Sequence, residues 1–142
     1  MTRITDPEES NLEAQPKTSN GKTVFIVEDD PFISRMYQVK LVGAGFKVEL
    51  ANNGRDAYER LRTIGPDLVL MDINLPEMTG FEVVKALRND GASDLLKNII
   101  ILTNSANPDD RKLAQQYGID YVVKAELTPR DVLEKINKKL GL

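Results

Sequence analysis

The chain has 142 residues, 41% of them apolar, and its 19 basic and 22 acidic side chains give a formal charge of −3. This length and apolar content predict one domain with a substantial core. The near-balanced charge indicates no nucleic-acid partner, because such proteins carry a basic face. Neither cysteine nor histidine occurs, which excludes disulfides, thiol chemistry, His-ligated zinc and any imidazole acid or base.

The first 21 residues differ in composition from the rest. Asp, Glu, Ser, Asn, Pro and Thr dominate them, so they contain too few apolar groups to offset the entropy of ordering. We predict a disordered or flexible N-terminal tail over 1–21 and one domain over 22–142. The chain does not open with a signal-peptide pattern, and no apolar run approaches the roughly 20 residues that span a bilayer. We therefore expect a cytoplasmic protein without a membrane partner.

Short apolar runs predict the strands. Four of them are continuous and are typical of strands buried on both faces, as in a parallel sheet; they cover 24–27, 68–71, 99–102 and 121–123. A fifth run, 46–51, alternates between apolar and polar residues. This alternation indicates an edge strand with one wet side.

Helices are predicted between the strands. Asp30 and Pro31 open the first helix, because Asp is a good N-cap and Pro fits the first turn; we interpret Asp30 as this cap rather than as a metal ligand. The apolar stripe of this helix contains Ile33, Met36, Tyr37, Leu41 and Val42. The second and third helices carry Ala57, Leu61 and Ile64, then Phe81, Val84 and Leu87. The fourth, near 109–117, has a weak stripe, and Thr128-Pro129 starts a clean last helix.

Strands and helices thus alternate five times along the chain. This order predicts an α/β fold, a doubly wound (βα)5 three-layer sandwich with a parallel five-stranded sheet. A flavodoxin-like strand order, 2-1-3-4-5, would put the first and third strands side by side. No glycine-rich phosphate loop follows the first strand, so neither a dinucleotide site nor a P-loop is expected.

Polar side chains follow four of the apolar runs. Glu28 and Asp29 follow the first, Asp72 the second, Thr103 the third and Lys124 the fourth. The carboxyl ends of parallel strands meet at one edge of the sheet, where doubly wound folds bind ligands. We therefore expect these side chains to converge.

Three neighbouring carboxylates repel one another unless a cation compensates, and Mg²⁺ with oxygen ligands is the natural choice. An ammonium and a hydroxyl on the other side complete a site suited to a phosphoryl group. One carboxylate would then be the nucleophile, as in aspartyl phosphates. Asp72 is the best candidate because it lies centrally.

The chain resembles the receiver domain of two-component response regulators over about residues 22–141. Four segments carry the resemblance, and they stand in the family's order at the family's intervals: VFIVEDDP, LVLMDINLPEMTGFEVV, IIILTNSA and DYVVKAELT. The resemblance implies a chemotaxis-type receiver made of one domain, with no effector segment. Such a chain either stands alone or is excised from a longer protein.

The resemblance also implies roles for individual residues. Asp72 would be the phosphorylation site, with Mg²⁺ held by Asp29, Asp72, the backbone carbonyl of Asn74, and Glu28 either directly or from the outer shell. Thr103 and Lys124 would contact the phosphoryl group. Tyr121 matches the aromatic residue that turns inward when the threonine moves.

Three positions depart from the family's usual pattern. Glu28 replaces an Asp, Asn104 replaces a small residue, and Ala125 replaces a Pro. Because a cis bond before a non-proline residue costs roughly 3 kcal/mol, we predict that the Lys124–Ala125 bond is trans. We expect Asn74, Asn104 and Ser105 to tune the loss of the phosphoryl group.

The resulting hypothesis is a phosphoacceptor response regulator rather than an enzyme, with at most self-phosphorylation and autodephosphorylation. Its partners would be a sensor histidine kinase or a histidine phosphotransfer protein and a downstream protein target. Analogy with the family allows a homodimer through the helix near 109–117, the strand at 121–123 and the last helix. One alternative is an unphosphorylated receiver-fold scaffold. Another is a Mg²⁺-dependent phosphatase of the haloacid dehalogenase class, which would need an Asp where Asn74 stands.

Overall fold

Five parallel strands form the centre of the fold. The structure is a computed structural model that describes residues 18–142, so most of the predicted tail over 1–21 lies outside the described residues. The strands are β1 (Thr23–Val27), β2 (Lys47–Ala51), β3 (Leu68–Met71), β4 (Ile99–Thr103) and β5 (Asp120–Val123). Their order in the sheet is β2-β1-β3-β4-β5, and every pair is parallel. The predicted fold class and strand order are confirmed.

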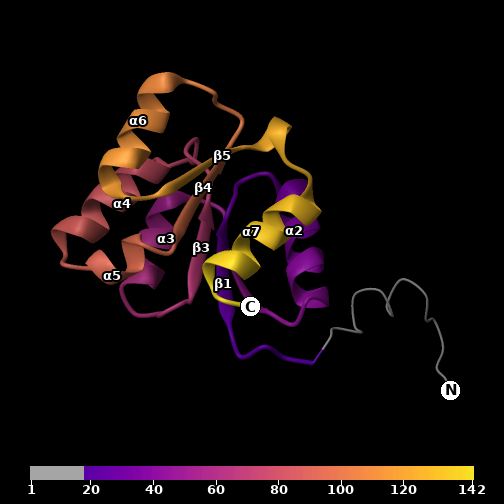
Figure 1. Cartoon of the computed structure of the whole chain (residues 1–142). Helices are drawn as coiled ribbons and strands as arrows, with labels where there is room; N and C mark the ends of the chain where they lie inside the picture. The colour runs from indigo at the N-terminus through magenta and orange to yellow at the C-terminus, as the bar shows by residue number, and fades with distance from the viewer. Residues whose placement is uncertain (1–17) are drawn as a thin grey trace, which may run out of the picture.

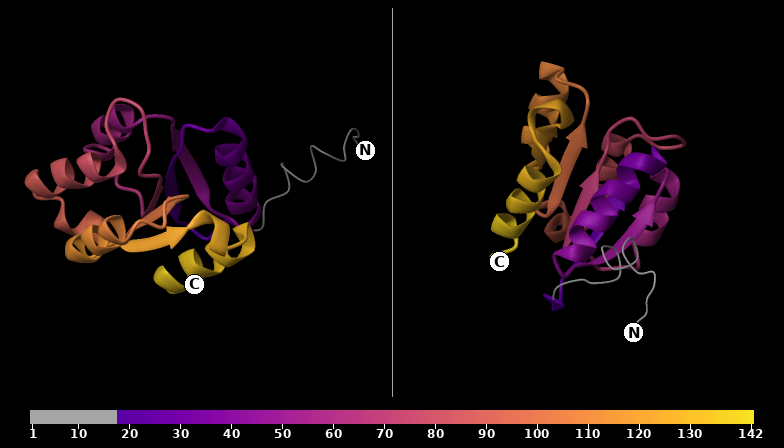
Figure 2. Two further views of the ribbon diagram at one scale, coloured as in Figure 1. Left: turned by 90° about the horizontal axis from the view of Figure 1, so that it is seen from above. Right: turned by 90° about the vertical axis from the view of Figure 1, so that its right-hand side faces the viewer.

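Helices cover both faces of the sheet. They are α2 (Pro31–Gly43), α3 (Gly54–Leu61), α4 (Gly80–Asn89), α5 (Ser93–Leu96), α6 (Pro108–Tyr117) and α7 (Pro129–Lys139), with a 3-10 turn at Lys124–Glu126. Figures 1 and 2 show α2 and α7 together on one face and the remaining helices on the other. No helix in the described part is both long enough and apolar enough to cross a bilayer.

Alternate residues of the central strands point to opposite faces and build two cores. Phe25, Met71 and Ile101 pack with residues of α3, α4 and α6. Ile26 and Leu70 pack with residues of α2 and α7. Each fully buried large side chain contributes about 1.5–3 kcal/mol. The continuous apolar runs of β1, β3 and β4 are therefore explained, because these strands are buried on both faces. The first two residues of β5 are only half-buried.

The starts of α2 and α7 follow the predicted signals. Asp30 caps α2, where its Oδ1 accepts hydrogen bonds from the N–H groups of Phe32 at 2.9 Å and Ile33 at 3.3 Å. Thr128 caps α7 in a reciprocal box with Asp131. The interpretation of Asp30 as a cap is thus confirmed. The same caps fix the strand-to-helix turns that follow β1 and β5.

Details of the helices differ from prediction, and one of them is that Ile64, expected on the second helix, lies beyond the end of α3 at Leu61. Met36 is 43% exposed, because Tyr37 and Leu41 occupy the face of α2 that meets the sheet and Met36 falls at its rim. The one-turn helix α5 was not predicted, because four residues are too few to show helical periodicity. None of these differences changes the edge of the sheet that carries the polar residues.

Candidate functional site

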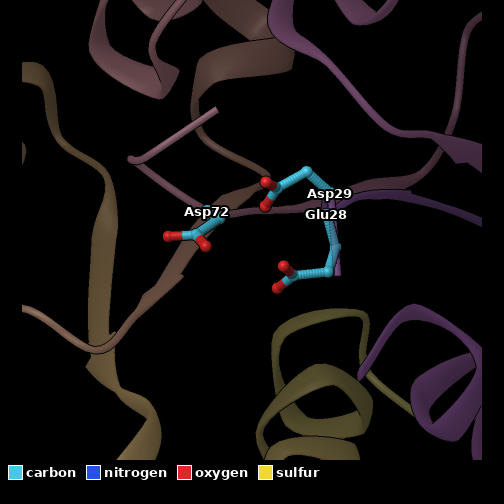
Figure 3. Close-up of side chains that lie close together, drawn as sticks. All are labelled: Glu28, Asp29 and Asp72. Carbon is cyan, nitrogen blue, oxygen red and sulfur yellow. The ribbon is translucent and has the colours of Figure 1, made fainter. Parts of the chain in front are cut away.

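The register of the sheet brings the predicted acidic residues together. Val27 pairs with Met71, so Glu28 and Asp72 follow at the same level of neighbouring strands. The Asp72 N–H donates to the Val27 carbonyl at 3.1 Å. Glu28, Asp29 and Asp72 each place a carboxylate oxygen within 4.8 Å of the others, and Figure 3 shows these three carboxylates gathered at the end of the strands.

Burial distinguishes the three acids. Glu28 is 6% exposed and Asp72 8% exposed, whereas Asp29 is exposed. Two buried carboxylates and one exposed carboxylate around one point form a hard oxygen donor set, which suits a divalent cation such as Mg²⁺. The residues present therefore fit the predicted metal. Asn74 lies exposed in the turn directly after Asp72.

The backbone after β3 holds one oxygen of Asp72. Its Oδ1 accepts hydrogen bonds from the N–H groups of Ile73 at 2.7 Å and Asn74 at 3.4 Å. Its Oδ2 lies 3.3 Å from Lys124 Nζ. The two oxygens therefore have different partners, one on the backbone and one on an ammonium group.

Two glycines fix the loop that follows Asp72. The Gly80 N–H donates to the Ile73 carbonyl at 2.8 Å, and the Gly54 N–H donates to the Pro76 carbonyl at 3.1 Å. A Cβ at Gly80 would overlap the Asp72 carbonyl, and a Cβ at Gly54 would overlap the Met78 carbonyl. Only glycine permits these approaches, so α3 and α4 clamp the loop from both sides.

Lys124 reaches both buried acids from the end of β5. Its Nζ lies 2.7 Å from Glu28 Oε1 and 3.3 Å from Asp72 Oδ2, and its side chain is 11% exposed. Burial raises the pKa of Glu28, although hydrogen bonds from Lys124 and the Asp30 N–H favour its charged form. Burial disfavours the charged ammonium, but Glu28 and Asp72 outweigh it and raise the pKa of Lys124. The lysine therefore stays charged.

Ser105 joins Thr103 to Tyr121. Thr103 is fully buried, and its Oγ1 accepts a hydrogen bond from the Ser105 N–H at 3.3 Å. The Tyr121 hydroxyl donates to the Ser105 carbonyl at 2.6 Å. The Ser105 hydroxyl donates to Asp110 Oδ2 at 3.2 Å, and the Arg111 guanidinium lies 4.9 Å from the centre of the Tyr121 ring.

The two other unusual positions lie beside Lys124. Asn104 and Ala125 line a groove of about 280 Å³ together with Lys124. No cis peptide bond occurs among the described residues, so the predicted trans Lys124–Ala125 bond is confirmed. Ala125 is the middle residue of the 3-10 turn over Lys124–Glu126.

Sequence reasoning missed one residue beside the site. Tyr37 is 4% exposed; it lines a small cavity of about 10 Å³ with Glu28 and Asp72 and also lines the groove at Lys124. Its sequence signal was a place on the α2 apolar stripe, which identified it as core. Nothing in that spacing shows that it lies under the ion pair.

A family model described as the response regulator receiver domain matches residues 24–137. The chain belongs to this family. DivK of Brucella anthropi, named a polar-differentiation response regulator, is 36% identical over 123 residues, covering 84% of this chain and 97% of DivK. MtrA of Mycolicibacterium smegmatis, named a DNA-binding response regulator, is 31% identical over 117 residues, covering 82% of this chain and 50% of MtrA.

Solved receiver structures agree with the fold. The chemotaxis response regulator CheY4 of Vibrio cholerae has a TM-score of 0.74 and 30% identity, covering 87% of this chain and 100% of that one. The BeF3-activated receiver domain of Klebsiella pneumoniae RstA has a TM-score of 0.74 and 27% identity, covering 84% and 99%.

The chain spans about half the length of the MtrA proteins that it matches. Those relatives are named DNA-binding regulators. We expected no nucleic-acid partner from the charge of the chain. Relatives that are named DNA-binding proteins do not support that expectation. The near-balanced charge describes these 142 residues alone.

Proposed function

We propose that this receiver domain accepts a phosphoryl group on Asp72 from a phosphohistidine of a kinase or phosphotransfer protein. The observation that carries the proposal is the asymmetric setting of the Asp72 carboxylate. Backbone N–H groups hold Oδ1, and Oδ2 faces the ammonium of Lys124. Contacts at both oxygens hold the carboxylate in one orientation, which pre-positions it for in-line attack.

The transfer exchanges one bond to phosphorus for another. Asp72 Oδ2 would form the new bond to phosphorus while the bond to the donor imidazole nitrogen breaks, and that nitrogen keeps the electron pair. Lys124 would form an ion pair with the transferred phosphoryl group, because its ammonium already lies beside Oδ2. Glu28, Asp29, Asp72 and the Asn74 carbonyl would hold Mg²⁺, which when bound supplies positive charge that offsets the charge on the phosphoryl oxygens.

The acyl phosphate would then change the face formed by α6, β5 and α7. Thr103 would turn to the phosphoryl oxygens and give up its bond from the Ser105 N–H. Tyr121 donates to the carbonyl of Ser105, so a movement of Ser105 would change both hydrogen bonds. This face is our proposed surface for a downstream protein, and by analogy for a homodimer, in a cytoplasmic protein.

The alternatives have less support. A scaffold without phosphorylation has no need for Lys124 placed between two buried acids. A haloacid-dehalogenase-like phosphatase would need an acid two residues after the nucleophile, where Asn74 stands. We therefore expect phosphoryl uptake and a loss of the phosphoryl group that Asn74, Asn104 and Ser105 tune, rather than turnover of phosphomonoesters.

Acetyl phosphate and Mg²⁺ test the proposal. The wild-type protein should gain one hydroxylamine-labile phosphoryl group, measured by intact-protein mass spectrometry. Asp72→Asn should gain none. Asp94→Asn, a matched change at a fully exposed side chain on α5, should behave like the wild type. Uptake of a labile phosphoryl group by Asp72→Asn would overturn the assignment.

A further inference from the structure

Both oxygens of Glu28 already have partners within the protein. Oε1 accepts a hydrogen bond from Lys124 Nζ at 2.7 Å, and Oε2 accepts one from the Asp30 N–H at 3.1 Å. The contact of Lys124 with Asp72, at 3.3 Å, is longer. In Figure 3 the Glu28 side chain leaves the ribbon in a different direction from Asp29, and its carboxylate lies apart from that of Asp29. Of the two acids that Lys124 contacts, Glu28 is therefore the nearer.

The surroundings of this pair exclude most water. Glu28 is 6% exposed and the Lys124 side chain 11%. Tyr37 on α2, itself 4% exposed, lines cavities shared with each of them. Charges attract more strongly when little solvent screens them. The pair is thus a firm contact, unlike an exposed surface ion pair.

The length of the Glu28 side chain makes this contact. An Asp at the same backbone position would be shorter by one C–C bond, about 1.5 Å, which exceeds the slack in a 2.7 Å hydrogen bond. An Asp would therefore leave the Lys124 ammonium to Asp72. Glu at this position thus changes which acid holds the lysine before any phosphoryl group arrives.

We propose that Glu28 is a positioning residue that holds Lys124 to one side of Asp72 in the unphosphorylated protein, so that metal entry must separate the pair. The inference rests on the proposed function and deepens it. A metal ion bound to Glu28 would lie beside the positive charge of Lys124, whose Nζ is 2.7 Å from Oε1, and the two cations would repel each other. Metal and ammonium therefore compete for one carboxylate, and the competition weakens Mg²⁺ binding.

A double-mutant cycle on Mg²⁺ affinity, measured by calorimetry in the unphosphorylated protein, tests the competition. Glu28→Asp should bind Mg²⁺ at least threefold more tightly than the wild type. In the Lys124→Gln background, the same Glu28→Asp change should alter the affinity by less than 1.5-fold. Glu126→Asp is the matched control, because it shortens an exposed Glu two residues from Lys124; it should change nothing. The proposal would be overturned if Glu28→Asp had an equal effect in both backgrounds. It would also be overturned if Glu28→Asp alone bound Mg²⁺ more weakly than the wild type.

A spectroscopic measurement reads the contact directly. Without Mg²⁺, the Lys124 ¹⁵Nζ should show a scalar coupling across the hydrogen bond to the Glu28 carboxyl carbon. Saturating Mg²⁺ should remove that coupling. A coupling to the Asp72 carboxyl carbon alone, or a Glu28 coupling that persists with Mg²⁺ bound, would contradict the assignment. A merely structural role for Glu28 would leave the signal insensitive to metal.

The two proposals can fail separately. Both measurements above use protein that carries no phosphoryl group. If the wild type takes no phosphoryl group but the cycle shows coupling, the proposed function fails and the role of Glu28 in holding Lys124 stands. If the wild type is phosphorylated on Asp72 and the cycle shows no coupling, the role of Glu28 fails and the function stands.

Discussion

Ser105 connects Thr103, the last residue of β4, to Tyr121 of β5. Its N–H donates to Thr103, and its carbonyl accepts from Tyr121. Its hydroxyl donates to Asp110 on α6, and the guanidinium of Arg111, the next residue on that helix, covers the Tyr121 ring. A displacement of Thr103, as proposed above, would therefore reach α6 through these hydrogen bonds.

Tyr121→Phe tests this connection. The change removes the hydroxyl that donates to the Ser105 carbonyl at 2.6 Å and keeps the ring under Arg111. Loss of such a bond should lower the free energy of unfolding by about 1 kcal/mol, and hydrogen exchange in 104–107 should become faster. Tyr117→Phe, which alters a ring stacked on Phe81, should change neither quantity. Equal effects of the two variants would show that the hydroxyl of Tyr121 does not hold the loop.

The residues at the strand ends could be predicted from the sequence. Carboxyl ends of parallel strands share one edge, so Glu28, Asp72, Thr103 and Lys124 had to lie near one another. The contact between Glu28 and Lys124 could not be predicted, because it depends on side-chain length and on which of two acids is nearer. Tyr37 was predicted as core, but its place beneath that pair depends on how α2 packs.

At the scale of elements, start signals predicted helices where a capping residue precedes proline. Asp30-Pro31 and Thr128-Pro129 begin α2 and α7 at those residues. The start of α6 was placed near Asp109, whereas Asn107 caps it, and its N-cap oxygen accepts from the Asp109 N–H at 2.8 Å. The sequence has the same signal here, because Asn107 precedes Pro108; the prediction relied instead on the weak apolar stripe of α6, which did not locate the first turn.

Gly80 is the point where α4 approaches the strand that carries Asp72. Gly80→Ala would force a Cβ against the Asp72 carbonyl, which should lower the free energy of unfolding by about 2 kcal/mol and slow phosphorylation. The control is Gly43→Ala at the end of α2, where a Cβ meets no atom within 4 Å. That change should raise stability by about 0.5 kcal/mol. Denaturant titration of both variants would reveal whether the close approach matters.

The capping box of α7 gives a pH dependence. Hydrogen bonds from the Thr128 backbone and side chain hold the pKa of Asp131 below its ordinary value of 3.8. A lowered pKa in the folded state means that this carboxylate stabilises the fold above the ordinary value and loses that effect as pH falls through the lowered one. The stability gap between wild type and Asp131→Ala should therefore shrink on acidification from neutral pH. A difference in the free energy of unfolding that stays constant down to the pH of acid unfolding would contradict this prediction.

At the scale of the whole molecule, the acidic site should make stability depend on Mg²⁺. A ligand that binds only the folded state, at ten times its dissociation constant, stabilises it by about 1.4 kcal/mol. Mg²⁺ should therefore raise the unfolding midpoint, and KCl of equal ionic strength should not. Asp29→Asn, which removes the exposed carboxylate of the group, should lose most of the Mg²⁺ effect. An undiminished effect in that variant would place the cation elsewhere.

The all-parallel sheet also has a kinetic consequence. Parallel neighbours cannot be joined by a hairpin and need a long crossover, and the contacts of Lys124 with Asp72 and Glu28 span 52 and 96 residues of chain. Contacts of such separation form slowly, because loop closure precedes them. No short fragment can assemble the three groups, so competence to take up a phosphoryl group should appear only with the last step of folding. A nascent or partly unfolded chain would therefore not accept a phosphoryl group.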